Sequence, residues 1–384
     1  MAAVTAPGVT SLPFRLVLVA TVLGFGGYAL LLPVVPLWAA GAGEFAAGAT
    51  TGVLMLTTIA TQLCVPWLVA RLGYRGVLGL GLVLLGAPTP LFALSSELGP
   101  VLAVSAVRGV GFGLLTVVVS ALVAELVAPA EHGRAAARYG VAIGLPQLAL
   151  LPAGVAVVDL VGFPVVFVLA GVAPLLGALA VPFLQVAPPS RAVERDVAPP
   201  VGAVRPLAAM LTCSVAQGGL VTFLPLAVPG AGLLVGAALL VTATGSLVGR
   251  SVAGRLVDRR GMGGRLLLPG VVLAAAGMGI EALAVEGGGV FVVVGAAVVG
   301  FGFGLVQNDA LTALFAAAGP QRYGSASAAW NIAYDAGTGV GAVGIGAVAD
   351  PFGFRAAFGL SALLLVLVAP VTWTRRIVIA RTGT

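Results

Sequence analysis

The sequence is poor in charge and in reactive side chains. It has no lysine, one histidine (His132) and two cysteines among 384 residues, and only 8% of its residues are charged. A soluble domain carries about a quarter of its residues as charges, so a soluble globule is excluded. Cys64 and Cys213 lie far apart within apolar runs, which predicts buried, inert thiols rather than a disulfide framework. No metal site or cofactor is expected.

Apolar residues dominate instead. They make up 60% of the chain, the mean hydropathy is +1.15, and 56 glycines and 25 prolines are spread through the sequence. Membrane helices tolerate Gly and Pro because neighbouring helices satisfy the freed backbone groups. At about 20 residues per span, the length allows about a dozen spans, whereas an outer-membrane barrel would show short alternating segments. We therefore predict an all-α integral membrane protein that is solvated by the lipid bilayer.

Charged residues mark the ends of the expected spans. Spans fit at about 14–38, 46–69, 76–95, 99–126, 163–184, 265–284, 288–313, 323–348 and 354–374, with a fifth helix ending at Asp159 and two more between Arg205 and Arg250. Residues 188–200 are proline-rich and charged, which is unfit for a bilayer. The predicted organisation is an N-terminal six-helix bundle over 1–186, a cytoplasmic linker over 187–205 and a C-terminal six-helix bundle over 206–384.

Nearly all arginines fall on one side of the expected membrane. Sixteen of the nineteen lie in segments on the side of the N-terminus, and Arg108 and Arg250 lie within spans. The segments on the other side hold Arg355 alone, together with the acids Glu44, Glu97, Asp159, Glu281, Glu286 and Asp350. Because cytoplasmic segments carry the excess of basic residues, we expect a multi-pass protein of the bacterial cytoplasmic (inner) membrane with both termini cytoplasmic. Arginines at the ends of apolar runs, rather than on one face, also argue against a nucleic-acid partner despite the net charge of +6.

The two halves of the chain repeat each other. The glycine-rich run at 109–114 matches the run at 300–305, and Asp159 matches Asp350, all at one offset of 191 residues. An ordered series of matches at a single offset is not expected by chance. We therefore predict twelve transmembrane helices in two pseudo-symmetric bundles, and parallel repeats of this kind place a substrate site at their interface near the bilayer midplane.

A cluster of charges on a glycine-bounded turn interrupts the second half. Its sequence is Gly254-Arg255-Leu256-Val257-Asp258-Arg259-Arg260-Gly261. This turn resembles the signature loop G-x-L-x-D-R-x-G of the major facilitator superfamily of secondary transporters. A degenerate copy lies 188 residues earlier, with Ala70 in place of the aspartate and with Arg71 and Gly73 retained. The resemblance implies the twelve-helix major facilitator fold and a transporter rather than an enzyme.

The resemblance also implies a gating role for this turn. A carboxylate at a cytoplasmic helix end can accept hydrogen bonds from the N-terminus of a helix in the opposite half, so we expect Asp258 to latch the inner gate against the start of helix 5, near 134–140. Anchoring of orientation is the alternative role of these charges, but the glycines permit a close approach that anchoring does not need. The predicted gating residues are Arg250, Gly254, Asp258, Arg259, Gly261, Arg71 and Gly73.

Two ionisable residues inside spans are candidates for the substrate or proton pathway. Arg108 precedes glycines in helix 4 and resembles a second motif of the family, which implies proton transfer or substrate contact; bonding to backbone carbonyls of helix 1 is the alternative. Asp335 lies about 20 Å into the membrane, where desolvation disfavours the carboxylate, as a proton-coupling group needs. A static arginine pair or helix–helix hydrogen bond is the alternative for Asp335.

Other polar residues complete the predicted pathway. Asp309, in the triplet Gln307-Asn308-Asp309, is nearer the cytoplasmic mouth and is a candidate for gating or substrate contact. Further cavity candidates are Asn331, Gln217 and Tyr28. Each of these three is more simply explained by a hydrogen bond between helices.

The sparse polar interior favours an amphipathic or apolar solute over a sugar. Pro146 and Pro152 in helix 5 loosely resemble the G-P-x-x-G-G motif of the family's drug/proton antiporters. We therefore predict a monomeric transporter that moves a small solute by alternating access, as proton-coupled efflux. Uptake of a small nutrient and a non-transporting membrane receptor are the alternatives. An intramembrane enzyme is disfavoured, because neither H-E-x-x-H nor G-x-S-x-G occurs.

Overall fold

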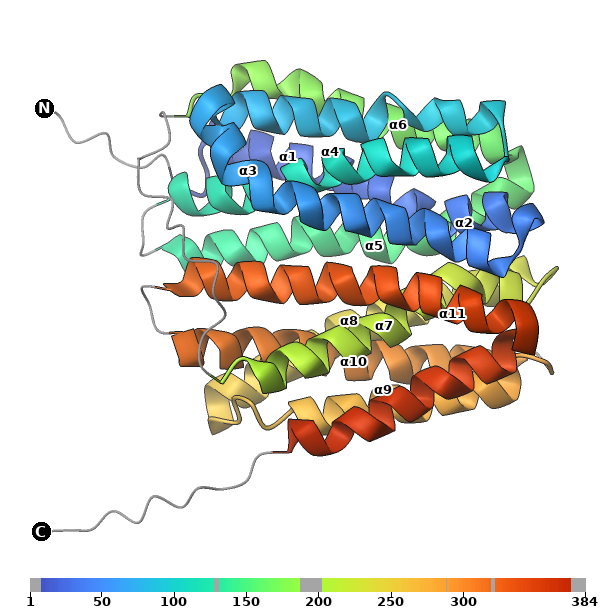
Figure 1. The fold of residues 1–384 in the computed structure, drawn as a ribbon. Coiled ribbons are helices and arrows are strands. Elements are labelled where there is room, and N and C mark those ends of the chain that lie inside the picture. Colours follow the sequence, from blue (N-terminus) through green and yellow to red (C-terminus); the bar gives the residue numbers. More distant parts are fainter. Residues whose placement is uncertain (1–7, 128–130, 187–201, 288, 319–321, 374–384) are drawn as a thin grey trace, which may run out of the picture.

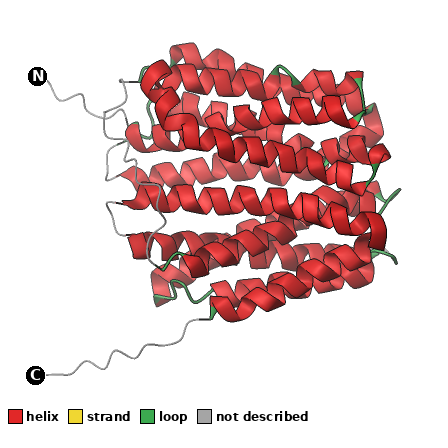
Figure 2. Cartoon of the chain, viewed as in Figure 1, coloured by secondary structure: helices red, strands yellow, loops and turns green. Residues whose placement is uncertain are grey.

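The computed structural model describes residues 8–127, 131–186, 202–287, 289–318 and 322–373. Within these residues all regular secondary structure is helical, with short loops between the helices (Figure 2). The all-α prediction is confirmed. The predicted linker falls mostly on 187–201, which lies outside the described residues, and α7 begins at Val204.

The long helices are arranged side by side, with their axes roughly parallel (Figure 1). They are α1 (Leu12–Leu31), α3 (Glu44–Gly86), α4 (Leu98–Glu125), α5 (His132–Val161), α6 (Phe163–Ala180), α7 (Val204–Ala227), α8 (Gly232–Arg260), α9 (Leu267–Ala284), α10 (Val290–Ala318) and α11 (Tyr323–Val368). The short α2 (Val34–Ala39) follows α1, and the 3-10 turn η6 (Ala369–Thr372) follows α11. We call the side where α1 begins and η6 ends the terminal side, and the opposite side the far side.

Ten helical segments of the described chain are long and apolar enough to cross a membrane. Two of them are much longer than one bilayer crossing requires: Glu44–Leu94 has 51 residues and Ser325–Thr372 has 48. Each contains a glycine with left-handed φ, Gly73 (φ 68°, ψ 168°) and Gly353 (φ 79°, ψ 167°). Glycine adopts this conformation without steric cost, and Figure 1 shows α11 doubling back at the far side.

Glycines also end the helices α5 and α8. Gly162 ends α5 with φ 80° and ψ 164°, nearly the conformation of its repeat partner Gly353. Gly261 ends α8 in the left-handed region: its N–H donates to Val257 O at 3.0 Å, and Met262 N–H donates to Leu256 O at 3.4 Å. The bond from Gly261 N–H to Val257 O is the bond of an αL cap, so the last glycine of the charged turn stops the helix.

The helices pack in two groups. Helices α1–α6 contact mainly one another, as do α7–α11, and the main contacts between the groups are α3 with α11 and α5 with α8. A Cβ on Gly109 of α4 would overlap the Leu54 carbonyl oxygen of α3, and one on Gly300 of α10 would overlap the Thr242 carbonyl oxygen of α8. The two matched glycine runs therefore serve the same purpose, close helix packing in a membrane.

Two expectations about burial are wrong. Cys64 was expected to be buried but is exposed, because it lies on an outward face of α3 beside Leu63 and Trp67, which are 59% and 55% exposed. Glu281 was expected in a segment outside the membrane, yet it lies within α9 and is completely buried. There Glu281 packs against Gly295 of α10, whose missing side chain leaves room for the carboxyl group.

Candidate functional site

A buried carboxylate lies where α3 meets α11. Asp335 on α11 is 4% exposed, and its Oδ2 accepts a hydrogen bond of 2.8 Å from Gln62 Nε2 on α3. Gln62 Nε2 also lies 3.3 Å from Thr116 Oγ1 on α4. A hydrogen bond to an ionised carboxylate is about twice as strong as a neutral one, and this one joins the two groups of helices. Sequence reasoning identified Asp335 but missed Gln62, whose only signal was an amide within an apolar span.

Two tyrosines, Tyr28 and Tyr334, connect Asp335 with other predicted residues. Tyr28 on α1 interacts electrostatically with Tyr334, Asp335 and Arg108, and Arg250 on α8 interacts with Tyr334. The Tyr28 hydroxyl is buried and has no hydrogen-bond partner among the described residues. Four helices, α1, α4, α8 and α11, thus bring the predicted residues Tyr28, Arg108, Arg250 and Asp335 into one central cluster.

Arg108 is held by backbone carbonyls. Its side chain is 1% exposed, Nε donates to Leu85 O at 3.3 Å, and Nη2 donates to Gly27 O at 3.2 Å. The guanidinium also lies 5.7 Å from the centroid of the Phe92 ring, within the range of a cation–π contact. These contacts match the alternative in which carbonyls of helix 1 hold Arg108. Its role in proton transfer or substrate contact stays a prediction.

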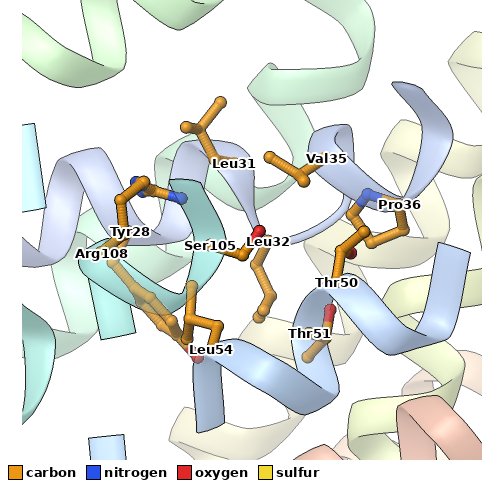
Figure 3. A pocket seen from close by; sticks show the side chains of 10 residues that line it. All are labelled: Tyr28, Leu31, Leu32, Val35, Pro36, Thr50, Thr51, Leu54, Ser105 and Arg108. Carbon is orange, nitrogen blue, oxygen red and sulfur yellow. The ribbon is translucent and has the colours of Figure 1, made fainter. Parts of the chain in front are cut away.

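A small cavity adjoins Arg108, with Arg108 and Tyr28 at one end of the view and Pro36, Thr50 and Thr51 at the other (Figure 3). It measures about 10 Å³, which is room for about one water molecule. A solute therefore does not fit against Arg108 in this conformation.

Asp309 is engaged with the turn between α8 and α9. Its Oδ1 accepts a hydrogen bond of 2.7 Å from Gly264 N, and its Oδ2 accepts one of 2.8 Å from Leu266 N. Arg205 Nη2 donates to Gly264 O, and Arg205 Nε donates to Thr372 O at 3.0 Å. The completely buried Asp309 thus fixes the turn that follows the charged motif. Its role in gating or substrate contact stays a prediction.

The neighbours of Asp309 lie close to other helices. The backbone oxygen of Gln307 accepts a hydrogen bond of 3.1 Å from Trp330 Nε1 on α11. Asn308 Nδ2 is the nearest atom to a Cβ placed on Gly254, at 3.9 Å. The triplet therefore lies between α8, which carries the charged turn, and α11, which carries Asp335.

The remaining amide candidates differ in their bonding. Asn331 Nδ2 donates to Ser327 O at 2.9 Å, a local bond within α11. Gln217 Oε1 on α7 is buried and has no hydrogen-bond partner among the described residues. Gln217 is therefore a stronger candidate for a solute contact than Asn331.

Among the residues that the structure describes, the predicted latch at the charged turn is not formed. Asp258 and Arg259 are exposed, and Asp258 makes no hydrogen bond or ion pair with the described residues of α5. In the degenerate copy, Arg71 lies over the Trp67 ring at 4.2 Å, a contact within α3. The latch and the gating role of these residues stay predictions.

Carboxylates hold the far side together instead. Asp350 on α11 accepts hydrogen bonds from Glu44 N at 2.6 Å and from Phe45 N at 3.0 Å, so it caps the first turn of α3. Its repeat partner Asp159, at the end of α5, lies so close to Gly232 that a Cβ there would overlap its Oδ2, and Gly232 is the first residue of α8. Each carboxylate therefore meets a helix N-terminus of the other group, where the helix dipole favours negative charge.

The family is established by sequence. The family model of the Major Facilitator Superfamily matches residues 17–342. The chain is a multi-pass membrane protein that belongs to the Major Facilitator Superfamily, and it is a transporter rather than an enzyme. A search of curated proteins found no match.

Solved structures share the fold at low sequence identity. A mutant of the peptide transporter POT is 15% identical, with a TM-score of 0.76 over 93% of this chain and 92% of its own. A POT family transporter in complex with 5-aminolevulinic acid is 14% identical, with a TM-score of 0.74 over 93% and 94%. A bacterial homologue of the human lysosomal transporter Spinster, inward-facing and occupied, is 14% identical, with a TM-score of 0.71 over 95% and 96%. At these identities the likeness shows the fold alone.

Proposed function

We propose that this protein is a secondary active transporter that moves a small, amphipathic solute out of the cell across the cytoplasmic membrane, by alternating access and in exchange for protons. The hydrogen bond between Gln62 and Asp335 supports the proposal most directly, because the buried ionisable group of Asp335 lies at the interface between the two helix groups. In a membrane interior, such a group is a functional candidate by default.

The proposed topology has twelve crossings in two six-helix bundles. Each of the two longest helical segments supplies two crossings, which are separated at Gly73 and Gly353. The arginine distribution assigns the terminal side to the cytoplasm. The bundles then correspond to 1–186 and 206–384, with a cytoplasmic linker between them.

In the proposed cycle, each side of the protein is closed in turn by a carboxylate clamp, which is a carboxylate of one helix group that meets a helix N-terminus of the other group. On the far side, Asp350 of α11 caps α3, and the side chain of Asp159, at the end of α5, lies against the first residue of α8. On the terminal side Asp258 is exposed and does not meet a described helix of the other group. We therefore assign this conformation to the state that is open to the cytoplasm. In the opposite state the far-side clamps separate and Asp258 reaches the N-terminus of α5.

Asp335 is the proposed proton carrier. When it is ionised, its bond from Gln62 is charge-assisted and ties α3 to α11 at the middle of the interface. Protonation removes the charge and weakens this tie, which lets the bundles separate. Arg108, Arg250 and Tyr28 supply the polar surroundings, and Gln217, Asn331 and the triplet 307–309 extend the proposed pathway.

Uptake of a small nutrient is the second candidate. It is supported by the fold shared with a transporter in complex with 5-aminolevulinic acid and with a peptide transporter. A non-transporting receptor is the third candidate, and it differs from both in moving neither solute nor protons.

The test is proton flux in proteoliposomes that contain the purified protein and an internal pH-sensitive dye. Asp335→Asn keeps the size of the side chain and its acceptor oxygen but cannot carry a proton. We expect substrate-driven proton flux to fall at least about tenfold, while solute-for-solute exchange remains. Glu286→Gln, which removes an exposed acid that pairs with Arg355 at 3.2 Å, is the matched control.

Two outcomes would contradict the proposal. Proton flux that survives Asp335→Asn removes this residue from the coupling mechanism. No movement of any drug or nutrient by the wild-type protein would favour the receptor.

A further inference from the structure

An apolar groove of about 570 Å³ runs between α1 and α5 on the terminal half of the molecule. Its volume is in the range of ligand-binding pockets, about 300–1,000 Å³. Eight of the nine residues that line it are apolar; the lining is Leu18, Val19, Val22, Leu23, Ala137, Arg138, Val141, Ala142 and Leu145. No residue of the central cluster takes part.

The groove opens on the outside of the bundle rather than toward the central cluster. On α1, the neighbouring faces are already covered: Gly24 packs on Leu115 of α4, and Gly27 packs on Ala170 of α6. The groove walls are instead well exposed, with Val141 at 65% and Leu145 at 57%. In a protein that is solvated by lipid, this surface faces acyl chains.

Arginines gather at the terminal end of both walls. On α1, Arg15 precedes Leu18 and Val19 by three and four residues, so it shares their helical face. On α5, Arg134, Arg138, Val141 and Leu145 follow one another at intervals of four, three and four residues, so they share one face. Arg15 and Arg138 are exposed, and so is 71% of the Arg134 side chain.

The position of Arg138 is fixed. Its Nη1 donates to the backbone oxygen of Val9 at 2.6 Å, which ties the start of α5 to the segment before α1. The guanidinium therefore stays at the mouth of the groove and offers its remaining N–H groups to an acceptor.

We propose that this groove is a binding site for an anionic phospholipid of the leaflet on the terminal side. One acyl chain lies along Leu18, Val22, Val141 and Leu145, and the phosphate accepts hydrogen bonds from Arg138 and Arg15. The apolar length below and the positive charge above match the two parts of such a lipid. Basic sites of this kind between membrane helices recruit anionic head groups.

The test compares phosphatidylglycerol with phosphatidylcholine of identical acyl chains, bound to the purified full-length protein and measured by native mass spectrometry. We expect the wild-type protein to prefer phosphatidylglycerol. Arg15→Gln leaves the Arg138–Val9 bond intact, and it should weaken phosphatidylglycerol binding by about fivefold, the effect of one basic residue near an anionic surface. Phosphatidylcholine binding should not change.

Arg265→Gln is the matched control, because Arg265 is exposed on the same side but on the turn between α8 and α9. Equal binding of both lipids to the wild type, or an equal loss in Arg265→Gln, would overturn the proposal.

A second pair of variants tests the chain-binding part. Val141→Trp fills the groove, whereas Leu179→Trp places the same ring on an exposed position of α6 (Leu179 is 66% exposed). We expect the first variant alone to lose bound phosphatidylglycerol. If both variants retain it, the lipid binds through its head group at a different site, and the groove is not the binding site.

Discussion

Arg108 shows how a charge is kept in an apolar interior. The guanidinium is planar and carries five N–H groups in a fixed fork, which lets it reach Gly27 O on α1 and Leu85 O on α3 together. Leu85 lies in the last turn of α3, and its carbonyl oxygen also accepts a hydrogen bond of 2.9 Å from Thr89 Oγ1. Arg108 therefore joins three helices of the first group.

The first prediction concerns the shape of this side chain. Arg108→Lys keeps the charge but replaces the fork by a single ammonium, which cannot reach both carbonyls. We expect the free energy of unfolding to fall by about 1.5–3 kcal/mol, the usual size of a hydrogen bond to a charged group. Thermal unfolding in detergent measures it, with Arg75→Lys as the exposed control. A variant with wild-type stability that no longer transports would instead place Arg108 in the pathway.

The second prediction concerns Asp309. Asp309→Asn leaves one acceptor oxygen where Gly264 N and Leu266 N now use two, so one buried N–H loses its partner at a cost of about 1–3 kcal/mol. The turn between α8 and α9 should open more often and become more sensitive to trypsin at Arg265. Asn308→Ala, at the adjacent position, should leave the cleavage rate near the wild-type value. Equal cleavage of both variants would show that Asp309 does not hold the turn.

At the scale of elements, Asp350 lies just before the kink of α11 at Gly353 and links this part of α11 to the beginning of α3. Replacing such a helix cap by alanine costs about 0.5–2 kcal/mol. Because donor and acceptor belong to different helix groups, this free energy favours the conformation in which the far side is closed, not only the folded state.

The third prediction follows from this link. Asp350→Ala should shift the conformational equilibrium toward the state open at the far side by about 2–30-fold. The measurement is the alkylation rate of a single cysteine at Thr51, which is buried and lines the small cavity, after replacement of Cys64 and Cys213. Glu97→Gln removes an exposed acid on the same side and should leave the rate unchanged. A rate that Asp350→Ala does not raise would mean that the cap does not stabilise closure.

The fourth prediction separates folding from movement at two glycines. A Cβ on Gly300 would overlap the backbone of α8, whereas one on Gly254 meets no atom nearer than 3.9 Å. Gly300→Ala should therefore reduce the yield of folded protein, and Gly254→Ala should fold normally but transport slowly, because its methyl group obstructs closure of the terminal side. Size-exclusion profiles and flux in proteoliposomes distinguish the two effects. Normal transport by Gly254→Ala would remove this glycine from the gate.

At the scale of the whole molecule, the sequence predicts the fold well because membrane spans are local. Apolar runs and the charges between them identify helices, and the repeat relates Asp159 to Asp350 without a structure. Contacts between distant helices are not local. In the sequence, Gln62 is an amide in an apolar span, and only the fold shows that α11 brings Asp335 to it. In the sequence, Asp350 is an acid outside the spans, and only the fold shows that it caps the N-terminus of α3. Glu281 was misplaced for the same reason, because only Gly295 on α10 makes room for it.

The last prediction concerns the movement of the two groups. Spin labels at the exposed positions Ala137 and Arg255 report on the terminal side, and labels at Gly41 and Pro351 report on the far side. If the carboxylate clamps alternate, transport conditions that shorten the first distance must lengthen the second, and Asp350→Ala must favour the same direction. Asp258→Asn should do the opposite, because it weakens the clamp that closes the terminal side. Distances that change independently of each other, or that neither variant shifts, would show that the two sides are not coupled through these carboxylates.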